Sequence, residues 1–166
     1  FMDNPSSPAT RKPVSHTKWW VGTAVVGVIL VLINLASPWI TFSGKKVTSQ
    51  TISGFGIAGH ISGIGKIAPY LLIFLAVVAF CLAVYAWIRK HSPYQVNLGF
   101  ITTGCLGLFL SLWQISAIRN QFLEGDYTTT QYHIGMWGSI LGFFFITLSG
   151  IMILREVSAT FHSRSG

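Results

Sequence analysis

Long apolar segments alternate with short polar ones along this chain, and four of the apolar segments are long enough to cross a membrane. The first, from Trp19 to Phe42, contains no charged residue. An α-helix rises about 1.5 Å per residue, so about 20 residues cross a hydrocarbon layer of roughly 30 Å. The pattern predicts membrane spans at about 19–41, 67–88, 94–118 and 134–154.

The polar segments between the spans predict how the helices are connected. Arg89, Lys90 and His91 end the second span, and Ser92-Pro93 supplies an N-cap and a first-turn proline for the third. A turn this short makes these two spans antiparallel neighbours. The other two connections are longer, and β-favouring residues at 47–52 and 127–132 predict that short strands can form in both.

The distribution of cations predicts the orientation of the helices. Seven lysines and arginines fall on the side of the two termini, and four fall on the side of the two longer loops. Cytoplasmic segments are enriched in such residues, so both termini are expected to be cytoplasmic and the two longer loops to lie outside. The chain then divides into a disordered cytoplasmic tail (1–18), one four-helix transmembrane domain (19–155) and a second cytoplasmic tail (156–166).

Small residues at helical spacing predict how the spans pack. Helices in lipid associate through close contact between small side chains, and every predicted span has such a stripe. The residues expected at helix contacts are Gly27, Ala76, Ala79, Ala83, Gly104, Gly107, Gly138 and Gly142. The predicted fold is therefore an all-α membrane protein, a bundle of four transmembrane helices.

Two amides and three tryptophans predict the depth of the helices. Asn34 and Gln114 fall at similar depths inside the first and third spans. An unpaired amide is costly in hydrocarbon, so each is expected to bond to the other, to a backbone carbonyl or to a trapped water. Trp19, Trp20 and Trp39 are expected to anchor the first span at the two headgroup layers, where indole rings are enriched.

Composition excludes several classes of function. The chain is 51% hydrophobic and 9% charged. Its net charge of +7 comes from basic residues in short clusters outside the spans, which argues against a nucleic-acid partner. Proton-coupled transport requires an ionisable residue within the membrane, and no such residue falls inside a predicted span. A thiol oxidoreductase requires a CxxC pair, and the sequence contains none. Neither a catalytic residue nor a cofactor is expected, so the chain is not expected to be an enzyme.

The histidines offer one weak candidate for a metal site. Axial haem ligands would have to lie within the spans, whereas all five histidines lie outside them. His60 and His133 each begin a re-entry from an outer loop, and together with Glu124 or Asp126 they could hold a divalent metal. Hydrogen bonds to loop carbonyls explain both histidines more simply, so no metal is expected.

The layout from Trp19 to Leu154 resembles that of claudin-type and small bacterial four-span proteins. The shared features are a span closing with Pro38-Trp39, a longer first outer loop with strand character and a shorter second one. The claudin loop signature, Gly-Leu-Trp followed by two cysteines, is absent. The resemblance therefore implies a topology and no specific function.

Three functional hypotheses remain. The first is a non-catalytic accessory subunit that packs against a larger respiratory, photosynthetic or transport complex. It rests on the absence of ionisable and cofactor-binding residues from the spans and on their many aromatic side chains. The second is a small homo-oligomeric transporter or channel. The third is an outer-surface metal or ligand sensor. The partners expected are the lipid bilayer and other membrane protein subunits, in a multi-pass protein of the bacterial cytoplasmic (inner) membrane.

Overall fold

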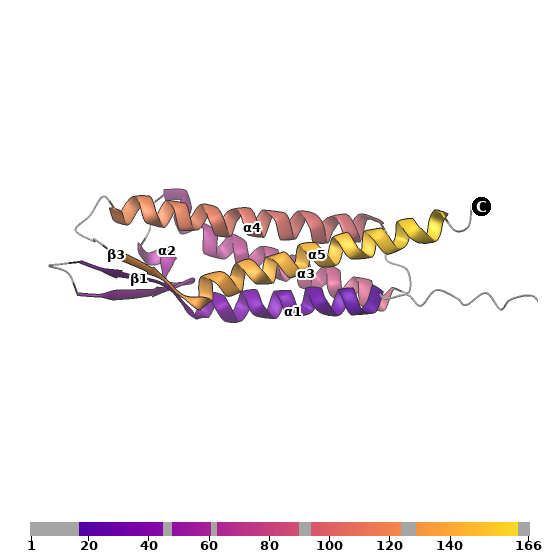
Figure 1. Cartoon of the computed structure of the whole chain (residues 1–166), viewed down its shortest axis with the longest axis horizontal. Helices are drawn as coiled ribbons and strands as arrows, with labels where there is room; N and C mark the ends of the chain where they lie inside the picture. Colours follow the sequence, from indigo (N-terminus) through magenta and orange to yellow (C-terminus); the bar gives the residue numbers. More distant parts are fainter. Residues whose placement is uncertain (1–16, 45–47, 61–62, 90–93, 124–128, 163–166) are drawn as a thin grey trace, which may run out of the picture.

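The computed structural model describes residues 17–44, 48–60, 63–89, 94–123 and 129–162, and these form a long helical bundle with a small sheet at one end (Figure 1). The elements in order are α1 (Thr17–Ala36), β1 (Pro38–Ser43), β2 (Gln50–Ser53), α2 (Ile57–His60), the 3₁₀ helix η1 (Gly63–Lys66), α3 (Ala68–Ile88), α4 (Tyr94–Leu123), β3 (Thr129–Tyr132) and α5 (Ile134–His162). We call the end that holds the strands the sheet end. The opposite end, where α1 begins and α5 finishes, is the terminal end.

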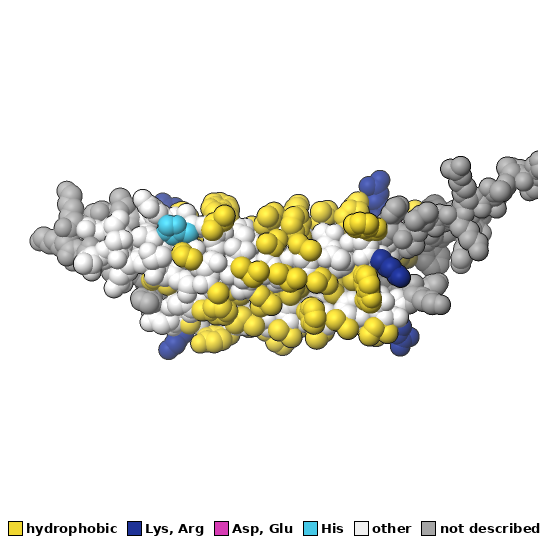
Figure 2. Space-filling model, turned by 90° about the horizontal axis from the view of Figure 1, so that it is seen from below, with side chains coloured by type: hydrophobic (Ala, Val, Ile, Leu, Met, Phe, Trp, Pro, Cys, Tyr) yellow, Lys and Arg dark blue, Asp and Glu magenta, His cyan; other side chains and the backbone are white. Residues whose placement is uncertain are grey.

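Four of the described helices are long and apolar enough to cross a membrane, as the sequence predicts. They are α1 and α3 in full, residues 94–120 of α4 and residues 134–159 of α5. Hydrophobic side chains cover the middle of the bundle, and lysines and arginines lie toward both ends (Figure 2). The chain is therefore a multi-pass membrane protein with a four-helix bundle.

Three helix ends differ from the positions that the apolar pattern indicates. One is that of α4, which ends at Leu123 rather than near residue 118. Helix α1 ends at Ala36 rather than near residue 41, because Pro38 lacks the N–H that would continue the helix and begins a strand instead. Helix α5 continues to His162, beyond the predicted end at residue 154. Residues 155–162 include neither glycine nor proline, so the helix can extend past the apolar segment.

Helices α1 and α5 make a close backbone contact through two glycines. A Cβ atom on Gly27 would lie 2.6 Å from the carbonyl oxygen of Gly142, and a Cβ on Gly142 would lie 2.6 Å from that of Gly27. Gly138 continues this contact, since its Cα faces the side chain of Asn34. Hydrogen in place of a side chain lets the two backbones touch.

Helices α4 and α5 pack in the same way. Gly104 lies against Thr147, and Gly107 lies against the ring of Phe143, which is fully buried. The neighbouring Phe144 is exposed, as expected for consecutive rings on one helix. At this interface between α4 and α5, the ring of Phe143 fills the space that a side chain at Gly107 would occupy.

Helix α3 contacts the bundle through alanine. Its buried residues are Ala76, Ala79, Ala83 and Ala86 together with Ala68, Pro69 and Leu72. Only 28% of its span is buried, against 39% for α1 and for α5. Helix α3 therefore presents the largest share of its side chains to the surroundings.

The three strands form an antiparallel sheet in the order β2-β1-β3, with β1 in the centre. Phe42 of β1 lies opposite Gln50 of β2 and Thr130 of β3. Ile40 and Phe42 alternate onto the same buried face, where they join the hydrophobic core. The sheet therefore unites both connections that the sequence assigns to the outside, and its central strand comes from residues expected to finish the first span.

The C-terminal carbonyls of α1, which have no partner within the helix, are bonded by the residues that follow. Ser37 Oγ donates to the carbonyl of Ile33, and the backbone N–H of Phe55 donates to that of Leu35. The carbonyl of Asn34 accepts from Trp39 Nε1 at 2.8 Å and from the N–H of Ser37. These bonds give three of the last four carbonyls of α1 a partner beyond the regular helix.

Candidate functional site

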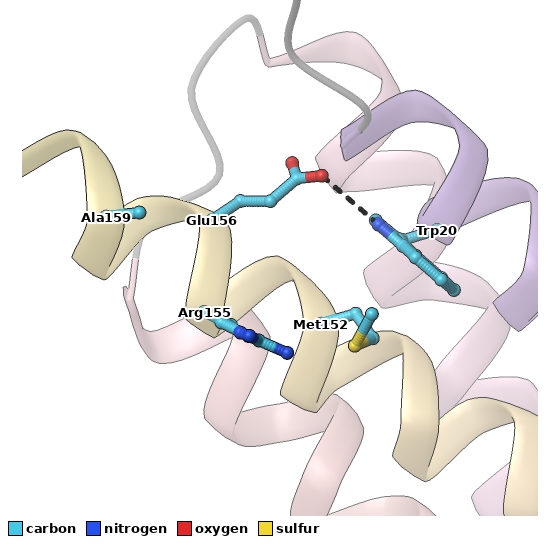
Figure 3. A pocket seen from close by; sticks show the side chains of 5 residues that line it. All are labelled: Trp20, Met152, Arg155, Glu156 and Ala159. Atoms are coloured by element: carbon cyan, nitrogen blue, oxygen red, sulfur yellow. Dashed lines mark hydrogen bonds between the residues drawn. The ribbon is translucent and has the colours of Figure 1, made fainter. Parts of the chain in front are cut away.

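A recess of about 290 Å³ lies at the terminal end, between the start of α1 and the last turns of α5 (Figure 3). Trp20 lines it from α1. Met152, Arg155, Glu156 and Ala159 line it from α5. It therefore combines apolar walls with one cation and one anion.

Glu156 connects the two helices across this recess. Its Oε1 accepts a hydrogen bond from Trp20 Nε1 at 3.2 Å, and its Oε2 accepts one from Thr17 Oγ1 at 3.0 Å. Thr17 begins α1, so the carboxylate also lies at the positive end of that helix dipole. The sequence predicts that Glu156 lies in the C-terminal tail, whereas the structure places it in α5, because the helix runs past the apolar segment.

Further cations lie at the terminal end. Lys18 Nζ lies 5.8 Å from the centre of the Trp87 ring, and Arg89 Cζ lies 5.3 Å from that of Tyr85. Contacts of this kind combine an aromatic ring with a cation, as at the headgroup layer of a membrane. They indicate that the recess and these contacts share one membrane interface.

The three anchor tryptophans differ in their surroundings. Trp19 is 78% exposed, as an interfacial anchor should be, and Trp20 is half-buried beside Glu156. Trp39, which the sequence predicts at the opposite headgroup layer, is fully buried. Its indole lies against Gly54 and Gly135, whose lack of a side chain leaves room for it. Trp39 therefore stabilises the join between α1 and β1 instead of contacting lipid headgroups.

The two amides do not bond to each other. Asn34 Nδ2 donates to the backbone carbonyl of Leu30 at 2.7 Å, one of the partners expected for it. Gln114 is fully buried, and neither polar atom of its side chain has a hydrogen-bond partner among the described residues. Its neighbour along the helix face, Ser111, bonds to its own helix at the carbonyl of Gly107. Gln114 is therefore a buried polar group that is costly unless it binds water.

Of the two candidate histidines, the structure describes the side chain of His133. His133 Nε2 lies 2.6 Å from Thr41 Oγ1, which in turn lies 2.8 Å from Thr51 Oγ1. The side chain of His60 lies outside the described residues, as do Glu124 and Asp126. Within the described part of the chain, no three histidine, cysteine or acidic side chains gather to hold a metal. His133 is engaged in the sheet, where it links β3 to α5.

The outward face of α3 was not singled out by the sequence interpretation. Six exposed residues alternate at spacings of four and three along it, the repeat of a coiled-coil seam. We call this set the α3 ridge; it consists of Tyr70, Phe74, Val77, Cys81, Val84 and Ile88. Because nearly every residue of α3 is apolar, only the structure shows which face is turned outward.

No family model matches this chain, and no curated protein is significantly similar to it.

Proposed function

We propose that this protein is a non-catalytic membrane subunit that packs against a larger membrane protein through the α3 ridge. The observation that supports the proposal is the division of α3 into two faces. Alanines face the bundle, and aromatic and branched side chains in a heptad pattern face away from it. Such a stripe can interlock with one helix of a partner, whereas contact with lipid needs no regular spacing.

The proposal includes the orientation and the location of the chain. The terminal end faces the cytoplasm, because it lies beside most of the cations in the sequence, and the sheet lies outside. The membrane is a bacterial cytoplasmic membrane. The partner belongs to a respiratory, photosynthetic or transport complex.

The polar residues of α4 favour this proposal over a homo-oligomeric transporter. A pore between copies needs polar side chains on an outward face. Ser111 and Gln114 instead face the interior, and Thr103 is 95% buried. Thr102 is exposed, but its hydroxyl donates to the carbonyl of Leu98 in its own helix.

Two substitutions at exposed cysteines test the proposal. Cys81→Trp places a bulky ring in the middle of the α3 ridge, and Cys105→Trp places the same ring on the outer surface of α4. The protein is purified from native membranes in mild detergent. A stoichiometric partner should accompany the wild type and Cys105→Trp and be absent from Cys81→Trp.

Photo-crosslinking locates the contact directly. Phe74 on the ridge and Phe109 on α4 are 61% and 66% exposed, so a benzophenone side chain at either position meets the surroundings equally. A crosslink from position 74 alone, to one protein identified by mass spectrometry, supports the proposal. A protein that runs alone contradicts it, and a crosslink to a second copy of this chain supports the homo-oligomer instead.

A further inference from the structure

The recess at the terminal end pairs a cation with an anion beside an apolar wall. Arg155 and Glu156 are consecutive in α5, so their side chains leave the helix about 100° apart. Glu156 extends toward Trp20, and Met152 lies one turn away along the same helix (Figure 3). No ion pair joins Arg155 to an acidic group within the described ranges, and the side chain is exposed.

Glu156 retains the capacity to bind a cationic donor. A carboxylate has about four lone-pair positions, and the bonds from Trp20 and Thr17 use one on each oxygen. Both of those donors are neutral, so they leave the negative charge of Glu156 in place. The carboxylate is thus held rigidly with spare acceptor positions at the edge of the recess.

The depth of the recess matches the headgroup layer of a membrane. Trp19 beside it is exposed, and Lys18 contacts Trp87 at the same end of the bundle. On the face that Figure 2 shows, hydrophobic side chains lie along the helices between the two ends of the bundle. A molecule in the recess would therefore have its polar part beside Arg155 and Glu156 and its apolar part beside Met152.

We propose that this recess binds a phospholipid whose headgroup carries both a phosphate and a primary ammonium group, as in phosphatidylethanolamine. The Arg155 guanidinium donates to the phosphate, which it can contact through two N–H groups. The ammonium group donates to Glu156. The acyl chains lie along Met152 and the indole of Trp20. This site is separate from the α3 ridge and does not depend on a protein partner.

The charges in the recess distinguish this lipid from others. Phosphatidylglycerol offers the phosphate but no cation, so Glu156 would repel it. Phosphatidylcholine carries a cation without an N–H, so it cannot donate to the carboxylate. Discrimination therefore comes from Glu156, whereas Arg155 contributes to binding of any phospholipid.

Native mass spectrometry of the full chain in mild detergent tests the proposal. The three lipids are offered at equal concentration with identical acyl chains. Bound phosphatidylethanolamine should exceed phosphatidylcholine about threefold, as expected for one hydrogen bond to a charged group at a half-exposed site. In Glu156→Gln, which keeps an acceptor for Trp20, this ratio should fall to about one. In Arg155→Gln, all three lipids should bind less.

A series of headgroups tests the wild-type protein without any substitution. Successive methylation of the ammonium nitrogen removes its N–H donors, so binding should fall in steps from phosphatidylethanolamine to phosphatidylcholine. The matched control is Arg119→Gln, which removes an exposed cation from α4 far from the recess and should change none of the ratios. Soluble O-phosphoethanolamine should not displace the lipid, because it lacks the acyl chains.

Several results would overturn the assignment. Equal binding across the methylation series, or a preference that survives in Glu156→Gln, would show that Glu156 does not bind the headgroup. Stronger binding of phosphatidylglycerol would show a site for anions. Displacement by O-phosphoethanolamine would show that the recess binds a soluble phosphate ester and no lipid.

Discussion

Two glycines of α1 allow the packing of the bundle to be tested with the same substitution in the same helix. Gly27 touches α5, whereas a Cβ atom on Gly22 would meet no other atom within 4 Å. We expect Gly27→Ala to destabilise the protein and Gly22→Ala to stabilise it. The comparison removes the contribution of helix propensity, which is shared by both positions.

The size of the effect follows from the contact distances. The new Cβ at position 27 would lie 2.6 Å from the Gly142 oxygen, whereas ordinary contacts begin at 3.4 Å, so α1 and α5 must separate by about 0.8 Å. Forced separation in a packed core costs about 1–3 kcal/mol, and a gap of this size weakens dispersion between the neighbouring atoms as well. Alanine recovers about 1 kcal/mol through its helix propensity.

Reversible unfolding in mixed micelles, followed by circular dichroism, measures both variants. The free energy of unfolding should fall by up to about 2 kcal/mol in Gly27→Ala and rise by up to about 1 kcal/mol in Gly22→Ala. The double variant Gly27→Ala/Gly142→Ala should lose less than the sum of its single variants, because the first substitution already separates the helices. Equal stability of Gly27→Ala and Gly22→Ala would refute the close contact between α1 and α5.

Three further measurements test other parts of the structure. Replacing Gln114 by methionine should raise the free energy of unfolding by about 1–2 kcal/mol, because it removes two buried polar atoms that have no hydrogen-bond partner. A decrease would show that the amide binds a water or a ligand. Trp39→Phe should lower the free energy of unfolding by about 2–4 kcal/mol, since the hydrogen bond to Asn34 is lost and a cavity forms. An unchanged melting temperature would contradict the role of the indole. In a variant lacking Cys81 and Cys105, a cysteine at the exposed position Ser49 should react with an impermeant maleimide in intact cells, whereas one at Ser158 should react only after the membrane is opened. The reverse pattern would invert the proposed topology.

Charge and length were sufficient to predict the helices from the sequence, because a membrane excludes charged side chains. They could not locate the end of α1. Residues Pro38 to Phe42 are as apolar as the helix before them, and an apolar run does not distinguish a buried strand from a buried helix. Proline followed by branched and aromatic residues was the signal that could have placed the strand there.

The sites were less predictable than the fold. The shared depth of Asn34 and Gln114 could be estimated from helix rise, but their partners depend on which way each side chain turns. The position of Glu156 depended on how far α5 continues beyond the apolar residues, which hydropathy does not measure. The α3 ridge required knowledge of which face the neighbouring helices cover.

The short connections between helices and strands have a mechanical consequence. Only Ser37 separates α1 from β1, and only His133 separates β3 from α5. If α1 slid past α5 by one helical turn, about 5.4 Å, then β1 would move along β3 by more than one residue. A slip of one residue turns every strand side chain to the opposite face, so Ile40 and Phe42 would leave the core. The sheet thus prevents α1 from sliding along α5, and loss of the hydrogen bonds between β1 and β3 would allow this movement.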